Sequence, residues 1–159
     1  MEESIAQPMT KERLMRYRSL RMENENQLER LARMKSGELF PAIREGEGAQ
    51  HTGTAGDRLT DAVIRRMEYE ERIRPLIEAN LREMGEIEAA IGRIQDPMER
   101  EVLRLRYLDG ACWRPMPWGE VALRIYGDND DKHLRATYRL YSRALSSMGV
   151  YDKEGDSDE

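Results

Sequence analysis

The sequence has little of what disulfide-bonded, metal-binding or membrane proteins require. It contains one cysteine and two histidines among 159 residues, so Cys112 cannot form an internal disulfide and no spacing of zinc ligands is present. No stretch approaches the roughly 20 apolar residues that a membrane-spanning helix needs, and the N-terminus lacks the basic-then-apolar pattern of a signal peptide. We therefore expect a cytoplasmic protein that binds neither a metal nor a membrane.

Patterns that support catalysis are also missing. We find no glycine-rich loop that could hold a phosphate, no nucleophile with a base at a recognisable spacing, and no cluster of metal ligands. The many carboxylates lie near arginines along helical patterns, where ion pairs three or four residues apart account for them. We expect neither an enzyme nor a cofactor.

Charged residues, in contrast, make up 36% of the chain, and aromatic residues only 6%. Together with many Glu, Arg, Leu and Met residues, this composition favours solvated helices over sheets. A chain of this length can form one globular domain or a small domain on an elongated extension. We predict an all-α protein with the second organisation.

The net charge of −5 is unevenly distributed. Residues 132–148 carry four basic side chains and no acid, whereas residues 149–159 carry five acids and one lysine. We expect the final segment to be an acidic, disordered tail, with DNA mimicry or autoinhibition as the alternative. Because Lys and Arg bind phosphates locally, the basic segment is compatible with nucleic acid in spite of the acidic total.

Residues 1–95 show two helical patterns separated by a glycine-containing segment. Thr10 is a suitable N-cap for the first helix, whose apolar positions follow an interrupted heptad pattern. We expect residues 36–57 to form a flexible loop. The second pattern begins near residue 57 and continues to Ile94 in steps of three and four, and Pro75 should kink or divide that helix.

Two such helices predict an antiparallel helical hairpin or coiled coil over residues 1–95. An apolar stripe of this kind is ordinarily a plain coiled-coil or bundle core. Two helices alone leave much of each apolar face uncovered, so we expect this region to form homo-oligomers or to bind a partner.

Residues 96–148 predict three further helices. The sequence Asp96-Pro97-Met98-Glu99 is typical of a capping box, with proline at the first helical position, and the helix that begins there should end at Asp109-Gly110. Two prolines follow in the link. A short helix then begins at Trp118 and ends at Gly127, and the last helix extends from about residue 130 to residue 148.

The last helix divides into two faces. Its inward positions are Leu134, Thr137, Tyr141, Ala144, Leu145 and Met148. The outward positions that we predict to contact DNA are Lys132, His133, Arg135, Ala136, Arg139 and Arg143. Arg135 and Arg139 are the main candidates. The alternative is that this basic face is solvated surface only and that His133 is merely exposed.

The segments IQDPMEREVLRLRYLDG, WGEVALRIYG and ATYRLYSRALSSM resemble region 4 of sigma-70 factors and phage regulators built on it. The layout is also similar to phage and prophage proteins of Gram-positive bacteria related to the ArpU and RinA late-gene regulators. The matching elements are Arg106 to Gly110, Trp118 with Val121-Ala122, and Arg143-Ala144-Leu145. The resemblance covers about 55 residues well, and the first hundred only in layout.

This resemblance implies a sigma-70 region 4-like helix-turn-helix over residues 96–148 that binds double-stranded DNA in a bacterial host cell. It also implies a role in transcription regulation and makes RNA polymerase a candidate partner. The chain departs from the family pattern in two places, because residues 111–117 and 127–133 are both longer than usual. The first departure makes Trp113 compete with Trp118 for one core position, and the second shifts the register of the recognition helix.

Two other functions remain open at this stage. A small-terminase-like DNA-packaging subunit also joins a helix-turn-helix to oligomerising helices, and a coiled-coil adaptor that binds no DNA fits the acidic composition. Oligomeric state distinguishes the first alternative, because packaging subunits form large rings whereas regulators are usually monomers or dimers. The sequence favours a phage-type transcriptional regulator.

Overall fold

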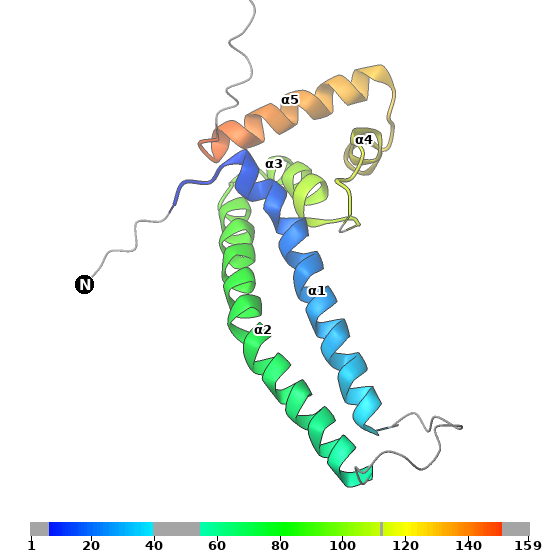
Figure 1. Cartoon of the computed structure of the whole chain (residues 1–159). Helices are drawn as coiled ribbons and strands as arrows, with labels where there is room; N and C mark the ends of the chain where they lie inside the picture. The colour runs from blue at the N-terminus through cyan, green and yellow to red at the C-terminus, as the bar shows by residue number, and fades with distance from the viewer. Residues whose placement is uncertain (1–6, 40–54, 112, 151–159) are drawn as a thin grey trace, which may run out of the picture. The chain divides into compact units, whose positions relative to one another are not determined.

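The chain is all-α over the part that the computed structural model describes, which is residues 7–39, 55–111 and 113–150 (Figure 1). Its α-helices are α1 (Lys11–Leu39), α2 (Ala55–Gly92), α3 (Pro97–Leu103), α4 (Trp118–Tyr126) and α5 (Asp131–Ser147). A single turn of π-helix, η1 (Arg104–Leu108), continues α3. No β-strand occurs in those ranges, so the prediction of an all-α protein is confirmed.

Contacts divide the chain into two compact units. Of the described residues, unit 1 contains 7–22, 82–111 and 113–150, and unit 2 contains 23–39 and 55–81, so α1 and α2 each contribute to both. This division differs from the predicted boundary between residues 95 and 96. The physical reason is that the start of α1 and the end of α2 share one core with the C-terminal helices.

In unit 2, α1 and α2 run antiparallel around a small core. Leu31 packs with Tyr69 and Ile73, and all three are buried. Beside them, the buried Asn80 donates a hydrogen bond from Nδ2 to Oδ1 of the buried Asn24 at 2.9 Å. A buried polar pair in this seam disfavours other registers, because sliding the helices would break the hydrogen bond between the two amides.

The ends of these two helices differ from the sequence-based expectation. Helix α1 continues through Gly37 to Leu39 and α2 begins at Ala55, so both edges of the loop predicted over residues 36–57 are helical; residues 40–54 lie outside the described ranges. Helix α2 is continuous through Pro75 and is not divided there. Pro75 is exposed, so water can hydrate the backbone carbonyl that loses its hydrogen bond.

Unit 1 contains the main core. Helix α1 contributes Leu14, and α2 contributes Ile87 and Ile91, which pack with buried side chains from α3 and α5 such as Leu103 and Leu140. Each of these five side chains is at most 1% exposed. Burial of an aliphatic side chain of this size is worth about 1.5–3 kcal/mol, so the first turns of α1 are an integral part of the C-terminal unit.

An ion-pair cluster fixes α1 to α2 within unit 1. The Arg13 side chain is 7% exposed, and its guanidinium donates to Glu83 at 2.8 and 2.9 Å and to Glu86 at 2.6 Å. Its remaining nitrogen donates to the backbone carbonyl of Gln7 at 2.7 Å. The hydrogen bonds from Arg13 lower the pKa of Glu83 below its ordinary value, so this carboxylate stays charged in the folded state.

Two further arginines of α1 bind the backbone at the end of α3 and η1. Arg18 donates to the carbonyl of Arg106, and Arg21 donates to the carbonyls of Leu108 at 2.7 Å and Gly110 at 2.8 Å. The last carbonyls of a helix have no partners within the helix. Helix α1 therefore supplies the C-terminal cap of α3 and η1.

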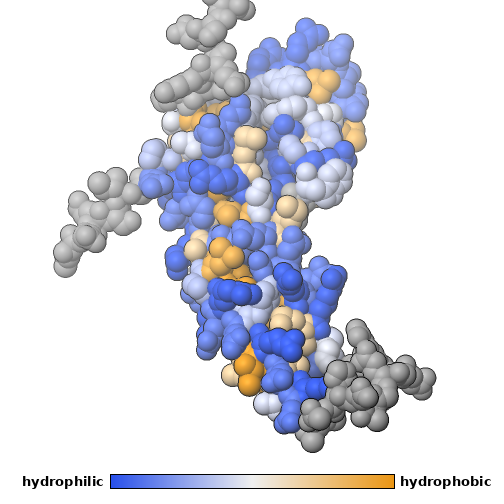
Figure 2. Space-filling model, in the orientation of Figure 1, coloured by the Kyte–Doolittle hydropathy of each residue, from blue (hydrophilic) through white to orange (hydrophobic). Residues whose placement is uncertain are grey.

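The face drawn in Figure 2 is mostly hydrophilic, and its apolar residues form small separate patches. Among the described helices, none combines the length and apolar character that crossing a lipid bilayer requires.

Loss of the Arg13 cluster should destabilise unit 1. We expect Arg13→Leu to lower the free energy of unfolding by about 2–3 kcal/mol, because two charged hydrogen-bonded partners lose their donor. Urea unfolding followed by circular dichroism measures this change. Arg16→Leu is the matched control, since Arg16 is exposed on the same helix and should change stability by no more than about 0.5 kcal/mol.

The same cluster predicts an acid dependence. Because the pKa of Glu83 is lower in the folded state than its ordinary value of 4.5, its contribution to stability is present above that pH and is lost as the pH falls through the folded-state pKa. The destabilisation caused by Glu83→Gln should therefore shrink in acid. An equal loss of stability at neutral pH and well below pH 4.5 would contradict this assignment.

A fragment limited to residues 96–159 should fail to fold cooperatively. It lacks the buried side chains of α1 and α2 and both arginines that cap η1. We expect a broad thermal transition and weak dispersion of amide signals in a proton–nitrogen correlation spectrum. A sharp transition and a dispersed spectrum for the fragment would show that the α1 and α2 contacts are dispensable.

Candidate nucleic-acid interface

The N-terminus of α3 confirms part of the predicted capping box. The Asp96 carboxylate accepts a hydrogen bond from the Met98 amide at 2.8 Å, and Pro97 occupies the first helical position. Glu99 does not complete the box, because its carboxylate accepts a hydrogen bond from the Ser147 hydroxyl at 2.8 Å. Glu99 instead connects the start of α3 to the end of α5.

Trp118, and not Trp113, occupies the core position for which the sequence offered both tryptophans. Its ring lies edge-on to Tyr141 and Tyr138, with ring centroids 4.7 and 5.2 Å apart, and the Arg106 guanidinium lies 4.4 Å from its ring centroid. Trp113 is 71% exposed. The half-buried position between α4 and α5 is therefore filled by Trp118 and not by Trp113.

Helix α4 packs closely on α5 because its inner face is small. Val121 and Ala122 are completely buried, as expected for Ala122 from the sequence. The helix ends at Gly127, which has a φ of +78° and donates its amide to the Leu123 carbonyl at 2.8 Å. This left-handed residue lets the chain reverse direction within a few residues before α5 begins.

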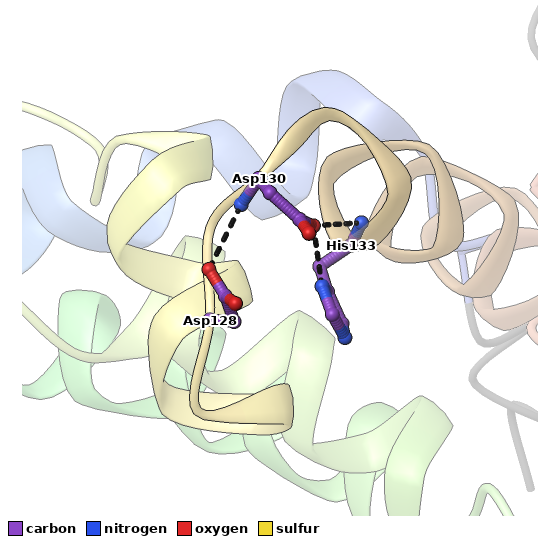
Figure 3. A group of neighbouring side chains, drawn as sticks. All are labelled: Asp128, Asp130 and His133. Atoms are coloured by element: carbon purple, nitrogen blue, oxygen red, sulfur yellow. Dashed lines mark hydrogen bonds and ion pairs between the residues drawn. The ribbon is translucent and has the colours of Figure 1, made fainter.

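The turn between α4 and α5 gathers Asp128, Asp130 and His133 (Figure 3). Asp130 is the N-cap of α5, because its carboxylate accepts from the His133 amide at 2.9 Å and also contacts the His133 ring. These hydrogen bonds lower the pKa of Asp130. Asp128 accepts from the Asn129 amide at 2.7 Å and from the Asp130 amide at 3.2 Å, so the cap of α5 and hydrogen bonds within the turn account for this cluster.

The two faces predicted for α5 agree closely with its burial. Thr137, Ala144 and Leu145 are buried, and the other three predicted inward residues are half-buried. The prediction missed Leu140, which is 1% exposed. Leu140 lies between the predicted inward positions on the helical period, so strict use of that period would have included it.

The structure brings four predicted contact residues to one exposed surface of α5, namely Lys132, Arg135, Arg139 and Arg143. The three arginines are spaced by four residues and therefore form a stripe along the helix. Within the described residues, no carboxylate pairs with any of these arginines.

The remaining two predicted residues are placed differently. Ala136 is half-buried and belongs to the edge of the surface. His133 is not simply an exposed side chain, which was the alternative considered from the sequence. Its ring contacts Asp130 and lies 5.6 Å from the Tyr126 ring. It contributes to the cap of α5, which leaves Lys132 and the arginine stripe as the cationic part of the surface.

An open groove of 660 Å³ follows this stripe. It is lined by Tyr126, Ala136, Tyr138, Arg139, Ser142 and Arg143, none of which is acidic. The sequence prediction did not include Tyr126, Tyr138 or Ser142. Tyr138 and Ser142 directly precede predicted arginines on the same helix, and this adjacency could have identified them as part of the surface.

Comparison of the chain with models of known protein families, with curated proteins and with solved structures finds no match. The candidate site is therefore defined by its own geometry.

The turn at Gly127 yields a stability prediction. Gly127→Ala should destabilise the protein by about 1 kcal/mol, because a side chain is unfavourable at positive φ even though no atom lies within 4 Å of the added methyl group. Gly127→Asn should cost less, since asparagine tolerates this conformation. Thermal unfolding of both variants measures the difference.

The matched control for this prediction is Gly85→Ala. Gly85 lies within α2, and an added methyl group there also meets no atom within 4 Å. Alanine should stabilise that position by about 0.5–1 kcal/mol. Equal effects of the two alanine substitutions would contradict the role assigned to the left-handed turn.

Proposed function

We propose that α4 and α5 form a helix-turn-helix that binds double-stranded DNA and that the protein is a phage-type transcriptional regulator. The observation that carries this proposal is the stripe of Arg135, Arg139 and Arg143, which is exposed and has no carboxylate partner in the described residues. Arginine and lysine side chains on the outer face of a recognition helix reach base edges and phosphates of the major groove.

The short, glycine-terminated α4 and its close packing on α5 support the same proposal. In a helix-turn-helix, the first helix crosses the DNA backbone and the second enters the groove. Here the buried Val121 and Ala122 let α4 pack closely on α5, and Gly127 supplies the turn between the two helices. The sigma-70 region 4-like sequence pattern adds a promoter-associated role to the proposal, with RNA polymerase as a partner.

The distribution of acids favours contact through the middle and end of α5. Asp128 and Asp130 lie at its start, where their carboxylates accept backbone amide protons. Carboxylates there would repel phosphates, whereas the arginine stripe begins one turn later. The main contacts proposed are therefore Arg135, Arg139 and Arg143, with Lys132 at the margin.

For unit 2 we propose homo-oligomerisation or partner binding. Several of its large apolar side chains are exposed, namely Leu28, Leu59, Ile64, Met67, Leu76 and Leu81. Exposed apolar side chains on a helical pair favour association when they are covered by another chain.

Substitution of the stripe tests the DNA interface. Arg135→Ala with Arg139→Ala should weaken binding to a duplex from the protein's own genomic neighbourhood by about tenfold to a hundredfold. Raising the salt concentration should weaken wild-type binding steeply, and the double variant should show a smaller salt dependence because fewer counterions are released. Fluorescence anisotropy of a labelled duplex at several salt concentrations measures both effects.

Arg93→Ala with Arg104→Ala is the matched control. Both residues are exposed in unit 1, lie outside α5 and do not line the groove along it, and the net charge changes by the same amount. This control should bind duplex DNA nearly as well as the wild type. Equal affinity of the two double variants would place DNA binding outside the stripe, or show that only total charge matters.

A further inference from the structure

A second groove in unit 1 differs in character from the groove along α5. It has a volume of 440 Å³ and lies among the start of α1, the link that precedes α4, and α5. Its described lining includes Lys11, Arg18, Arg106 and Arg114 and no carboxylate. Arg18 and Arg106 already donate to backbone carbonyls, and the exposed Arg114 is the cation most open to a ligand. A ligand of complementary charge is therefore an anion.

Aromatic rings also line this groove. Trp113 is 71% exposed, and the Arg114 guanidinium lies 4.6 Å from its ring centroid. Tyr138, which is 46% exposed, and Trp118 also line the groove. Each ring is held by a neighbour, because Trp118 stacks with Arg106 at 4.4 Å and Tyr138 contacts Trp118.

The groove adjoins the proposed duplex interface. Tyr138 lines both grooves, so the surface of Arg139 and Arg143 and the cluster around Trp113 share this side chain. A nucleic acid held on the stripe would place further phosphates near the second groove.

We propose that this second groove binds unpaired, single-stranded nucleic acid. Exposed rings stack on the faces of nucleobases, and adjacent cations neutralise the phosphates between them. A duplex cannot use such rings in the same way, because each base face is already covered by the neighbouring base pair. An acidic peptide would satisfy the cations but offers few flat faces for Trp113 and Tyr138.

The role of each residue follows from its surroundings. Trp113 is the stacking platform, because it is the most exposed large ring that the structure describes. Arg114 holds that ring on one side and provides a positive charge next to it. Arg106 is a positioning residue, since it donates to the Met116 carbonyl at 2.6 Å and stacks on Trp118.

The test uses the full chain with labelled single strands of about ten nucleotides, one of oligo-dT and one of oligo-U, in anisotropy titrations at low salt. We expect wild-type binding to at least one strand, and the two strands distinguish DNA from RNA. Trp113→Ala should weaken that binding by roughly five- to a hundredfold. Trp113→Phe should retain most of the affinity, because a phenyl ring still stacks, but should lose much of the quenching of tryptophan fluorescence.

Controls separate this proposal from duplex binding by α5. Trp113→Ala should leave duplex binding near the wild-type level, whereas Arg135→Ala with Arg139→Ala should reduce duplex binding and leave oligo-dT or oligo-U binding largely unchanged. Trp113 is exposed, so its variants should fold, and circular dichroism checks this. Arg93→Ala is the matched control for Arg114→Ala, which should weaken binding of the single strand.

Three outcomes would overturn the proposal. The first is a wild-type protein that binds neither single strand at low salt. The second is equal affinity of Trp113→Ala, Arg114→Ala and the wild type for the strand that is bound. The third is quenching of Trp113 by a poly-glutamate peptide and not by either oligonucleotide, which would make the occupant an acidic peptide.

Discussion

Two arginines of α1 cap the end of α3 and η1, and this contact fixes the point from which the rest of unit 1 continues. Arg18 and Arg21 donate to backbone carbonyls at the end of α3 and η1. The π-turn brings this end of the helix to Asp109, whose amide donates to the Arg104 carbonyl at 2.8 Å. Without α1, these carbonyls would need water as their partner, and the link that follows would lose its fixed starting point.

A series of side-chain contacts connects this cap to α5 and the candidate interface. Arg106, whose carbonyl accepts from Arg18, donates its own side chain to the Met116 carbonyl and stacks on Trp118. Trp118 in turn packs on Tyr138 and Tyr141 of α5. The position of α5 therefore depends on α1 through a continuous series of contacts within unit 1.

Sequence patterns predicted the local features of this unit well. The caps at Thr10, Asp96 and Gly127 were predicted, because capping depends on residues that are adjacent in sequence. The inward face of α5 was also predicted, apart from Leu140, because a helix of seventeen residues samples its period several times.

Contacts between distant segments were not predicted. The expected boundary near residue 95 followed a change in pattern, whereas Arg18 and Arg21 contact residues more than eighty positions away. A side chain that binds a backbone carbonyl leaves no periodicity and no complementary residue type in the sequence. The same limitation hid the pairing of Glu99 with Ser147 and the groove around Trp113, since both depend on how α3, α5 and the link are placed.

The electrostatic organisation of unit 1 accounts for how an acidic chain can present a basic surface. Asp96, Asp128 and Asp130 accept amide protons at helix starts or in the turn, and Glu83 pairs with Arg13. These carboxylates have structural partners. In contrast, no described carboxylate pairs with Arg135, Arg139 or Arg143, and Arg135 Nε donates to the backbone carbonyl of Asp131 at 3.2 Å. The net charge of −5 is thus a poor guide to the field along the arginine stripe, because the acids lie elsewhere, at helix starts or in ion pairs such as Glu83 with Arg13.

The stiffness of α5 makes the spacing of its arginines meaningful. The helix is capped by Asp130 at its start, packed by Trp118 at its middle and bonded through Ser147 to Glu99 at its end. Arg135 and Arg143 are therefore held about 12 Å apart along the axis, which is close to the width of a DNA major groove of about 12 Å. In the DNA contact proposed above, a helix fixed at both ends would lose little backbone entropy, and the main entropic cost would be the lost rotamer freedom of the three arginine side chains.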